Sequence, residues 1–378
     1  MENTLSCCYV TKIDEIKEIV GADNIEQARI GGWNCIVKKG EYKPGDLVVV
    51  ATTDAVIPES LSDSMNVTNY LRKGGRVRTV KLRGVYSECL IIPLTYTPRP
   101  ATYKEGDDLM KELNIFKYEP PVKQITLSSG KKIRYSENPN FLIYHKFPNQ
   151  KNVPDMFNEE DDVQITRKIH GTNARYAIVK KTKLSLLDRF KMSVAKKIKP
   201  SWKWAEYEFS VGSHNVEKGS DSQGYYDANV WYDINDEYLI KEKLWNYVKT
   251  KNTDIGSGII LYGEIYGAGI QKGYDYDLNH IQFMGFDVMV NGSYLNTDDA
   301  YKIIEDDLGL RHVPVLYKGK WNKEIQDSFV YNNFIPNTKV PEEGVVVKIT
   351  TGERSKVSKV INPDYLIFCE KNNVGDSH

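Results

Sequence analysis

The sequence predicts an α+β protein in which a small β-barrel module precedes a larger domain of strands and helices. Short alternating strands separated by glycine turns fill residues 28–94, as expected for a small barrel. Apolar, strand-like runs then recur in the second half of the chain, at 259–267, 281–290 and 342–349. Helical spacing of apolar residues is found in 180–204 and 297–337, so both kinds of element are expected there.

The composition limits the classes of function. A chain of 378 residues with 40% hydrophobic content is long enough for two domains, or possibly three. Its formal net charge is zero, so any nucleic-acid binding must come from local patches. The odd number of cysteines, five, without a Cys-x-x-Cys pair favours a reducing, cytoplasmic setting. We find no secretion signal and no apolar run of about 20 residues, so we expect no membrane span.

The N-terminal module is expected to cover residues 1–115. A strand in 28–43 precedes a Pro44-Gly45-Asp46 turn and the apolar run 47–50, and a second strand pair follows at 76–94. The stretch 13–30 carries a short helix pattern. Proline pairs and polar residues indicate a connector at 116–150, and a polar tail closes the chain at 371–378.

Two segments are rich in positive charge. The first, the basic segment of residues 72–83, contains six cations and no acid: Arg72, Lys73, Arg76, Arg78, Lys81 and Arg83. On strands, Arg76 shares a face with Arg78, and Lys81 with Arg83. The segment is either a groove that follows a phosphate backbone or a solvated edge protected by charge.

The second, the basic insertion of residues 180–204, has nine Lys or Arg and one acid, Asp188. Leu187, Phe190, Val194 and Ile198 recur at helical spacing, and Pro200 ends the pattern. Three interpretations stay open: an RNA-facing insertion, a helix on a membrane surface, or a surface helix packed through one stripe.

The stretch 165–176 places Lys168 three residues ahead of a glycine, in a run that alternates like a strand. A lysine that attacks a nucleotide phosphate must be neutral, so it needs cationic neighbours or a metal around it. The leaving pyrophosphate needs positive charge. Carboxylates and an aromatic slot must hold the metal, the ribose and the base.

The chain supplies these groups in order. Glu264 lies in the first apolar run and Phe286 beside Asp287 in the second; Glu343-Gly344 opens the third, and lysines follow it at 348, 356 and 359. A carboxylate in an apolar run is costly to bury without a partner. The series therefore indicates a charged site assembled from several strands.

The string Lys-x-His-Gly-x-Asn at 168–173, followed by Gly-Glu-x-x-Gly-x-Gly-x-Gln at 263–271, Phe-Asp, Glu-Gly and the lysine strand, resembles the nucleotidyltransferase motifs of ATP-dependent RNA ligases. The first 115 residues resemble the N-terminal OB module of one RNA ligase branch. The resemblance implies an adenylyltransferase domain of antiparallel sheets with flanking helices at 151–370. It implies ATP and Mg²⁺ or Mn²⁺ as cofactors, and RNA with 3′-hydroxyl and 5′-phosphate ends, in a nicked duplex, as the partner of a monomeric enzyme.

The resemblance also implies roles for single residues. Lys168 would form the lysine–AMP bond, and Glu264 would hold the ribose hydroxyls. Phe286 would stack on adenine, and Val346 would press on its other face, although both residue types are common in cores. Asn173 would meet a phosphate or the RNA terminus.

Two further roles concern charge. Glu343 would help to position the metal, through water, and Lys359 would contact the α-phosphate. The family often has a second lysine two residues before Lys359, where this chain has Val357. Lys356 is the nearest substitute for it.

Histidines stand at two positions of note. His170 replaces the aspartate of DNA ligases, as is typical of RNA-sealing relatives, or it is an ordinary strand residue. His214 stands where the family usually has arginine, and an imidazole cannot make the forked bonds of a guanidinium. Arg175, on the same strand face as Asn173, could assist with RNA. The resemblance does not cover Arg175.

Two other functions remain open from the sequence. One is a capping guanylyltransferase or DNA ligase, against which His170 and the Gly-x-Gly-x-Gln extension argue. The other is a non-catalytic OB-type RNA-binding protein, against which the intact lysine and both glutamates argue. The favoured prediction is an ATP-dependent RNA ligase.

Overall fold

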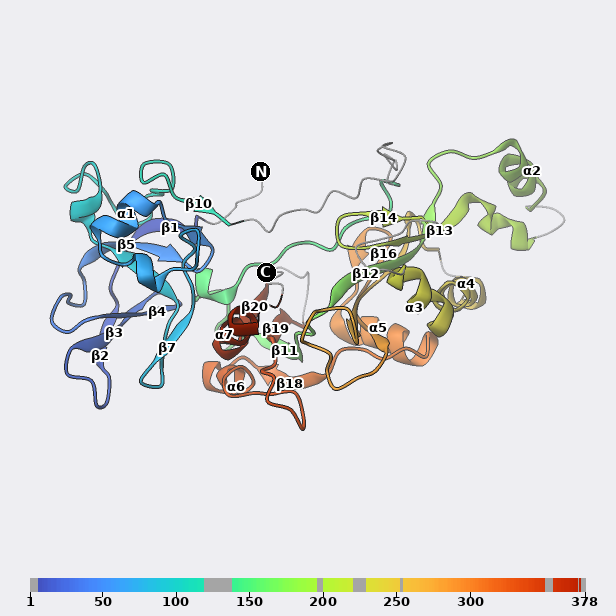
Figure 1. The fold of residues 1–378 in the computed structure, drawn as a ribbon. Coiled ribbons are helices and arrows are strands. Elements are labelled where there is room, and N and C mark those ends of the chain that lie inside the picture. Colours follow the sequence, from blue (N-terminus) through green and yellow to red (C-terminus); the bar gives the residue numbers. More distant parts are fainter. Residues whose placement is uncertain are drawn as a thin grey trace.

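The computed structural model describes residues 6–118, 138–195, 200–219, 229–251, 254–350, 356–372 and 374. The molecule is elongated (Figure 1), with the N-terminal strands at one end and helix α2 (Leu186–Ala195) at the other. No helix among the described residues is both long and apolar enough to span a bilayer. All five cysteines are described, and none forms a disulfide.

The N-terminal module is built around strand β5 (Leu47–Thr52). It pairs with β1 (Cys8–Lys12) on one side and β9 (Cys89–Ile92) on the other. Val49 and Ala51 lie in one apolar cluster, whereas Val48 and Val50 lie in another. Because side chains alternate along a strand, β5 is buried on both faces, which explains its unbroken apolar run.

The remaining elements of the module close around these two clusters. They are β2 (Glu15–Glu18), β3 (Ile25–Ile30), β4 (Trp33–Lys38), β6 (Ala55–Val56), α1 (Glu59–Ser64), β7 (Val80–Leu82), β8 (Val85–Ser87) and β10 (Phe116–Lys117). Strands β2, β3 and β4 form an antiparallel sheet, and β10 pairs with β6. The module thus combines local hairpins with pairings between strands that are distant in the chain, β1–β5–β9 and β6–β10.

Two local predictions for this module are wrong. Residues 15–30 form the β2–β3 hairpin rather than a helix, because Ile16, Ala28 and Ile30 of these strands pack in one cluster. Lys81 and Arg83 do not share a strand face: Arg83 and Gly84 both have positive φ and form the two-residue turn between β7 and β8, a conformation typical of tight hairpins.

The second domain contains two antiparallel sheets. The larger has the order β14-β13-β12-β15-β16-β17, and the smaller has the order β18-β11-β19-β20. The larger sheet consists of β12 (Thr172–Lys180), β13 (Tyr207–Gly212), β14 (Glu217–Lys218), β15 (Gly258–Gly267), β16 (Ile281–Val290) and β17 (Ser293–Tyr294). The smaller consists of β11 (Asp162–Arg167), β18 (Val315–Lys320), β19 (Gly344–Ile349) and β20 (Val357–Ile361).

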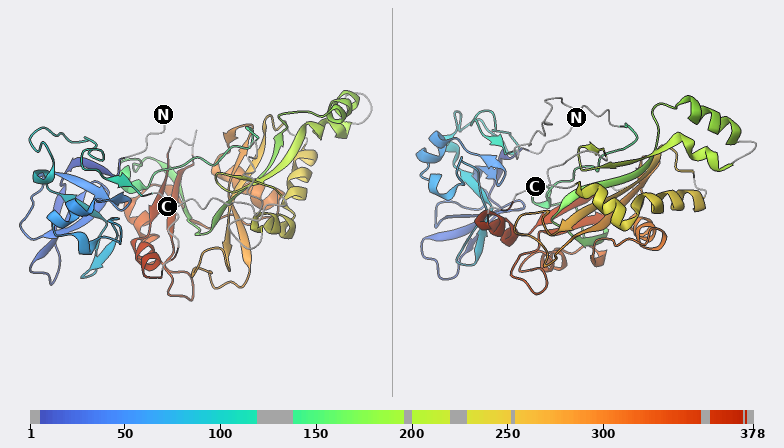
Figure 2. Two further views of the ribbon diagram at one scale, coloured as in Figure 1. Left: turned by 45° about the horizontal axis from the view of Figure 1, so that its top comes forward. Right: turned by 45° about the vertical axis from the view of Figure 1, so that its right-hand side comes forward.

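Helices cover one face of the larger sheet. They are α3 (Val230–Tyr238), α4 (Ile240–Lys251) and α5 (Thr297–Lys302), which a π-helical turn, Ile303–Asp307, continues. Figure 2 shows α3 and α4 lying along the sheet. Leu244 of α4 and Ile304 pack with Ile178 and Leu261 of the strands. The other face carries Ala177 and Tyr262, which pack with Phe141 and Tyr144.

The segment 297–337 forms a helix, a stop at Leu308-Gly309, a strand and a second helix, α6 (Lys323–Ser328), as the sequence predicts. The final helix, α7 (Pro363–Asn372), lies between the N-terminal module and strands β19 and β20 (Figure 1). Its first residue is a proline, which is favoured at the first helical position.

Candidate active site

Lys168 lies between the two sheets, in the link from β11 to β12. The strand ends at Arg167, so the prediction that Lys168 lies within a strand is wrong. Its backbone N–H donates to the carbonyl of Gly344 over 2.9 Å. Its Nζ lies 2.6 Å from Oε1 of Glu343, whose side chain is 1% exposed. Lys168 is thus held both at its backbone N–H and at its side-chain amine.

Strand pairing explains how these distant residues meet. β11 runs antiparallel to β19, with Arg167 opposite Val345. The residues that immediately follow β11 and immediately precede β19 therefore lie side by side. The same pairing places Arg167 Nε 3.0 Å from Glu342 Oε2. The Lys168–Glu343 pair is a direct result of this register.

Glu264 enters the centre from β15 of the larger sheet. It lies directly opposite Asn173 of β12, so the two side chains share a face. Burial raises the pKa of Glu264 to about 8, while Lys168 lowers it and Glu343 raises it further. Both carboxylates therefore act on one another and on the lysine. Asn173 Oδ1 is buried and has no hydrogen-bond partner among the described residues, which leaves an acceptor beside Glu264.

Lys359 is the second cation of the centre. It lies on β20, directly opposite Val346 of β19. Burial lowers its pKa to about 8, with a further lowering by the charge of Lys168 and an opposing effect of Glu343. Two lysines that repel each other beside a carboxylate form a site prepared for additional negative charge.

A buried lysine joins the two sheets at the predicted base site. Lys348 of β19 donates to the carbonyl of Phe286 over 3.0 Å and lies 3.2 Å from Asp287 Oδ2. Tyr144 donates to the same Asp287 oxygen over 2.9 Å. Burial lowers the pKa of Lys348 to about 7. Phe286 of one sheet and Val346 of the other, both half-buried, are therefore held on either side of one junction.

His170 lies in a tyrosine cage at the edge of the centre. Its side chain is 1% exposed, and its Nδ1 is 3.9 Å from Glu343 Oε2. The hydroxyl of Tyr365, on α7, is 3.1 Å from the same nitrogen, and the hydroxyl of Tyr276 accepts the backbone N–H of His170 over 2.6 Å. The Tyr274 ring packs edge-on against the imidazole at 4.9 Å between centroids. His170 is thus a buried, fixed neighbour of Glu343.

Two predicted contacts lie outside this cluster. In this structure Lys356 pairs with Asp161 at 2.6 Å. Arg175 is fully buried, where it donates to the carbonyls of Ser213 and Phe141 over 2.7 and 2.8 Å. Its guanidinium holds backbone together and offers no surface to RNA. Val357, at the family's lysine position, is a buried residue of β20.

His214 lies close enough to Arg175 for the arginine to influence it. Burial lowers the pKa of His214, and the charges of Arg175 and Lys146 lower it further. A neutral imidazole results at neutral pH. This position therefore lacks the positive charge that an arginine would supply.

The basic segment of the N-terminal module faces α7. Arg78 Nη1 lies 2.9 Å from Glu370, and Arg72 contacts the same carboxylate at 3.5 Å. Lys81 lies 3.2 Å from Asp364, to which the hydroxyl of Tyr86 also donates over 2.8 Å.

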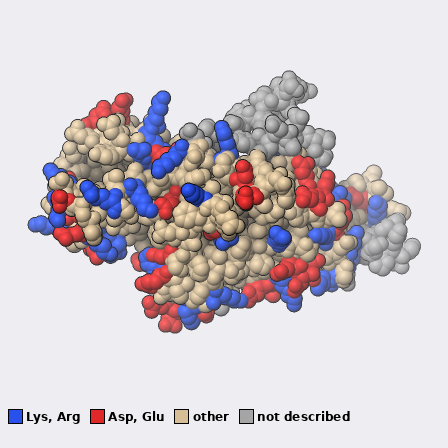
Figure 3. All heavy atoms as spheres, turned by 60° about the horizontal axis from the view of Figure 1, so that its bottom comes forward, with Lys and Arg blue, Asp and Glu red and all other residues tan. Residues whose placement is uncertain are grey.

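Away from α7, Arg76 pairs with Asp54 at 3.3 Å within its own module, and Arg83 is exposed at the hairpin turn. Neither open interpretation of the segment describes this arrangement. In this structure three of the six cations, Arg72, Arg78 and Lys81, pair with acids of α7. Figure 3 shows positive and negative residues interspersed over one face of the molecule.

The sequence reasoning missed Tyr365, Tyr276 and the structural use of Lys348. A proline followed by Tyr365 and a helical stretch was a usable signal for α7. No local sequence signal connects α7 with His170, because their contact depends on how β20 brings the chain back toward the centre.

The carboxylates of the centre fit a divalent ion that takes most of its ligands from phosphates and water. Among the described residues no group of three or more His, Cys, Asp or Glu side chains could enclose a metal. Mg²⁺ is commonly bound through one or two carboxylates together with phosphates and water. Glu343 and Glu264 match that pattern.

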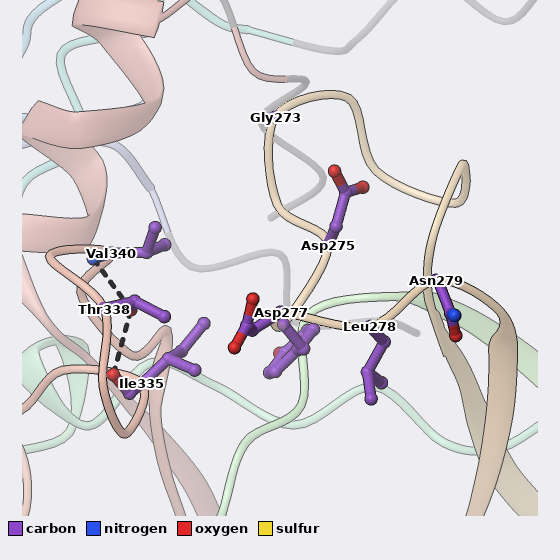
Figure 4. A pocket seen from close by; sticks show the side chains of 9 residues that line it. Gly273, Asp275, Asp277, Leu278, Asn279, Ile335, Thr338 and Val340 are labelled. Atoms are coloured by element: carbon purple, nitrogen blue, oxygen red, sulfur yellow. Dashed lines mark hydrogen bonds between the residues drawn. The ribbon is translucent and has the colours of Figure 1, made fainter.

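A cavity of about 590 Å³ adjoins the centre. Figure 4 shows Asp275, Asp277 and Leu278 on one side of it and the 335–340 turn on the other. Tyr276 lines this cavity and also contacts the backbone of His170. The cavity lies behind the tyrosine cage rather than between Lys168 and Lys359, so we do not take it as the nucleotide site.

Sequence comparison identifies the class of protein. The profile of the RNA ligase family matches residues 161–361, which hold Lys168, Glu264, Glu343 and Lys359. An OB-fold domain profile matches residues 7–94. The chain belongs to the RNA ligase family and carries an N-terminal OB-fold domain.

Solved structures of Naegleria gruberi RNA ligase are similar to the whole chain. A mutant without ligand has 23% identity and a TM-score of 0.69, and the match covers 97% of this chain and 98% of that one. A mutant with ATP and Mn has 23% identity and a TM-score of 0.69, covering 96% and 98%. A structure with PPi has 24% identity and a TM-score of 0.68, covering 97% and 99%. The curated proteins gave no match.

Proposed function

We propose that the protein is an ATP-dependent RNA ligase that joins a 3′-hydroxyl to a 5′-phosphate through a lysine–AMP intermediate on Lys168. The observation that carries this proposal is the pairing of Lys168 with Glu343, beside Glu264 and Lys359, at the junction of two sheets. The similar Naegleria ligase, solved with ATP and Mn and with AMP and Mn, supports ATP and a divalent ion as its cofactors.

In the first step, the Lys168 amine attacks the α-phosphorus of ATP. A nitrogen–phosphorus bond forms, the bond from that phosphorus to the bridging oxygen breaks, and pyrophosphate leaves while the amine loses a proton. The attack requires the neutral amine, so the 2.6 Å ion pair with Glu343 must separate first. Lys359 lies where its charge can stabilise the α-phosphate.

A divalent ion at Glu343 would supply positive charge to the phosphates and compete with Lys168 for the carboxylate. Glu264, opposite Asn173, supplies the acceptors for ribose hydroxyls. Phe286 and Val346 approach the base from the two sheets. Lys348, which donates a hydrogen bond to the carbonyl of Phe286, sets the distance between the Phe286 and Val346 side chains.

Two transfers complete the reaction. A 5′-phosphate oxygen of RNA attacks the lysine-bound phosphorus, the nitrogen–phosphorus bond breaks, and the amine regains a proton. The 3′-hydroxyl then attacks the activated 5′-phosphate, and AMP leaves. A nicked duplex suits this step, because pairing holds both ends in place. We place residues 1–115 in the OB module, 116–150 in the connector and 151–370 in the ligase domain of a monomer.

Covalent labelling tests the proposal. The protein is incubated with Mg²⁺ or Mn²⁺ and α-labelled ATP, α-labelled GTP or adenylate-labelled NAD, and retained label is read on a denaturing gel. Label from ATP alone is expected. Label from GTP would indicate capping chemistry, and no label from any nucleotide would indicate a binding protein. Sealing of nicked duplexes with ribose or deoxyribose at each end then defines the substrate.

A further inference from the structure

A shallow groove lies on the helix-covered side of the larger sheet, away from Lys168. Its volume is about 440 Å³, and it is lined by Trp204, Lys241, Glu242, Trp245, Asn246 and Lys249. Trp204 belongs to the 3₁₀ helix Pro200–Glu206, at the end of the basic insertion, and the other residues belong to α4. The basic insertion thus contributes one wall of the groove.

The lining residues of α4 form a regular row. Lys241, Trp245 and Lys249 are spaced four residues apart, so they follow one another along one side of the helix. With a rise of 1.5 Å per residue, the row is about 12 Å long. The Lys249 ammonium lies 5.3 Å from the centroid of the Trp245 ring. The row alternates cation, aromatic ring and cation.

The indoles are anchored on one side. Trp204 and Trp245 are half-buried and pack against the main core cluster of the domain. Trp204 also contacts the Tyr207 ring, with centroids 5.8 Å apart. Indoles that are fixed by the core and open toward a groove can receive a planar partner without ordering a flexible side chain.

The lysines of the row carry uncompensated charge. In the part of the chain that the structure describes, neither Lys241 nor Lys249 pairs with a carboxylate, in contrast to Lys251 on the same helix, which contacts Asp307 at 2.9 Å. Nearby, the Lys203 ammonium lies 4.5 Å from the Trp204 ring centroid. Glu242 is the single acid of the lining. The groove is therefore net positive.

We propose that this groove binds a single-stranded segment of the substrate RNA, with bases stacked on Trp245 and Trp204 and phosphates at the lysines. Anchored indoles flanked by cations are the features of sequence-tolerant single-strand sites. Bases in a duplex are already stacked on one another and offer no free face, so an unpaired segment fits better. The inference rests on the proposed RNA ligase function, and it favours the RNA-facing interpretation of the basic insertion.

The location separates this site from adenylation. The groove lies on the face covered by α3 and α4, whereas Glu264 lies on the opposite face of the same sheet. Loss of the groove should therefore weaken binding of RNA with unpaired extensions and leave the reaction of Lys168 with ATP unchanged.

The test measures fluorescence anisotropy of two probes on the full chain: a labelled 12-nucleotide single-stranded RNA and a labelled nicked duplex without overhangs. Trp245→Ala should bind the single strand about 5- to 150-fold more weakly, as expected for one lost base stack. The double variant Lys241→Gln/Lys249→Gln should lower the slope of log affinity against log salt by about 1.4. Binding of the duplex should change by less than twofold.

Three controls make the result interpretable. Lys243→Gln, on the same helix but directed at the Gly309 carbonyl over 3.3 Å, should behave as wild type. Label retained from ATP should be equal in all variants; its absence from wild type as well would overturn the proposed function rather than the groove. If Trp245→Ala does not fold, Trp245→Phe and the double variant Lys241→Gln/Lys249→Gln still test the proposal. Wild-type affinity and salt slope in the folded variants would overturn the RNA assignment and leave the groove to a protein partner.

Discussion

The proposed adenylation centre around Lys168 and the contact between the OB module and α7 are both made of ion pairs, but in different surroundings. Glu343 is 1% exposed beside Lys168, and the Lys348–Asp287 pair is almost fully buried. The Arg78 and Glu370 side chains of the domain contact are 31% and 23% exposed. Removing one partner of a buried pair leaves a charge in a poorly polarisable medium, whereas water replaces most of a lost surface pair. Substitutions in the centre should therefore have much larger effects.

The sharpest test of this contrast uses two lysines that flank strands of the smaller sheet, Lys168 just after β11 and Lys356 just before β20. Lys168→Ala should abolish covalent label from ATP, because no other amine occupies that position. Lys356→Ala is the matched control, since Lys356 pairs with Asp161 outside the centre, and it should retain label. Equal loss of label in both variants would contradict the expected difference between the two lysines. Persistent label in Lys168→Ala would remove this lysine from the mechanism.

The next effect concerns folding. Lys348→Ala leaves Asp287 buried without its cation and should lower the free energy of unfolding by about 3–5 kcal/mol, measured by urea denaturation. The double variant Lys348→Ala/Asp287→Ala should lose less than the sum of the two single variants, because both charges are removed together. A single variant as stable as wild type would show that the pair is not a buried junction between the sheets.

The third effect depends on pH. Burial raises the pKa of Glu264 to about 8, so the folded state holds this proton where the unfolded state has released it. Stability should fall as the pH rises from about 5 to 7, by at most about 1.4 kcal/mol per pH unit. Glu264→Gln should remove this contribution, as urea denaturation at each pH would show. Glu59→Gln, on the exposed start of α1, should not change the profile.

A smaller loss is expected when the hydroxyl facing His170 is removed. Tyr365→Phe deletes one hydrogen bond to a buried ring, worth about 0.5–1.5 kcal/mol, and should slow lysine–AMP formation by about 2- to 10-fold. Tyr317→Phe removes an exposed hydroxyl that bonds to the Lys320 carbonyl and should leave the rate unchanged. A rate equal to wild type in Tyr365→Phe would show that His170 needs no positioning from α7.

The smallest effect belongs to the domain contact. Glu370→Gln removes the shared partner of Arg72 and Arg78 and should change the free energy of unfolding by at most about 1 kcal/mol. Because this change removes a negative charge beside both arginines, it should strengthen binding of RNA at low salt, measured by anisotropy. Glu324→Gln, an exposed acid on α6, is the control. Weaker RNA binding by Glu370→Gln would mean that α7 itself belongs to the RNA surface.

The residues around Lys168 could be predicted from the sequence because the family motifs identify single residues in a fixed order along the chain. Lys168, Glu264, Glu343 and Lys359 come together through antiparallel registers that those motifs imply. Prediction from the sequence failed where the decisive contact is long-range or the backbone turns locally. Lys356 and Arg175 look like functional cations in the sequence, yet Asp161 and two backbone carbonyls engage them.

The basic segment shows the same limit. Its charge pattern was visible, but its partners on α7 lie almost 300 positions away, as in the Arg78–Glu370 bond with a separation of 292. The turn at Arg83 depends on a left-handed conformation that alternation alone does not reveal. Charge pattern located the cations, and tertiary structure decided what they contact.

The order of the strands has a consequence for synthesis of the protein. Lys168 and Glu343 are 175 positions apart in the chain, and His170 and Tyr365 are 195 positions apart. On the ribosome, the OB module can complete its short-range hairpins early. Lys168, in contrast, emerges long before the strands and helix that surround it. We therefore expect that an incomplete nascent chain does not consume ATP, and that the proposed chemistry arises only as the last elements fold.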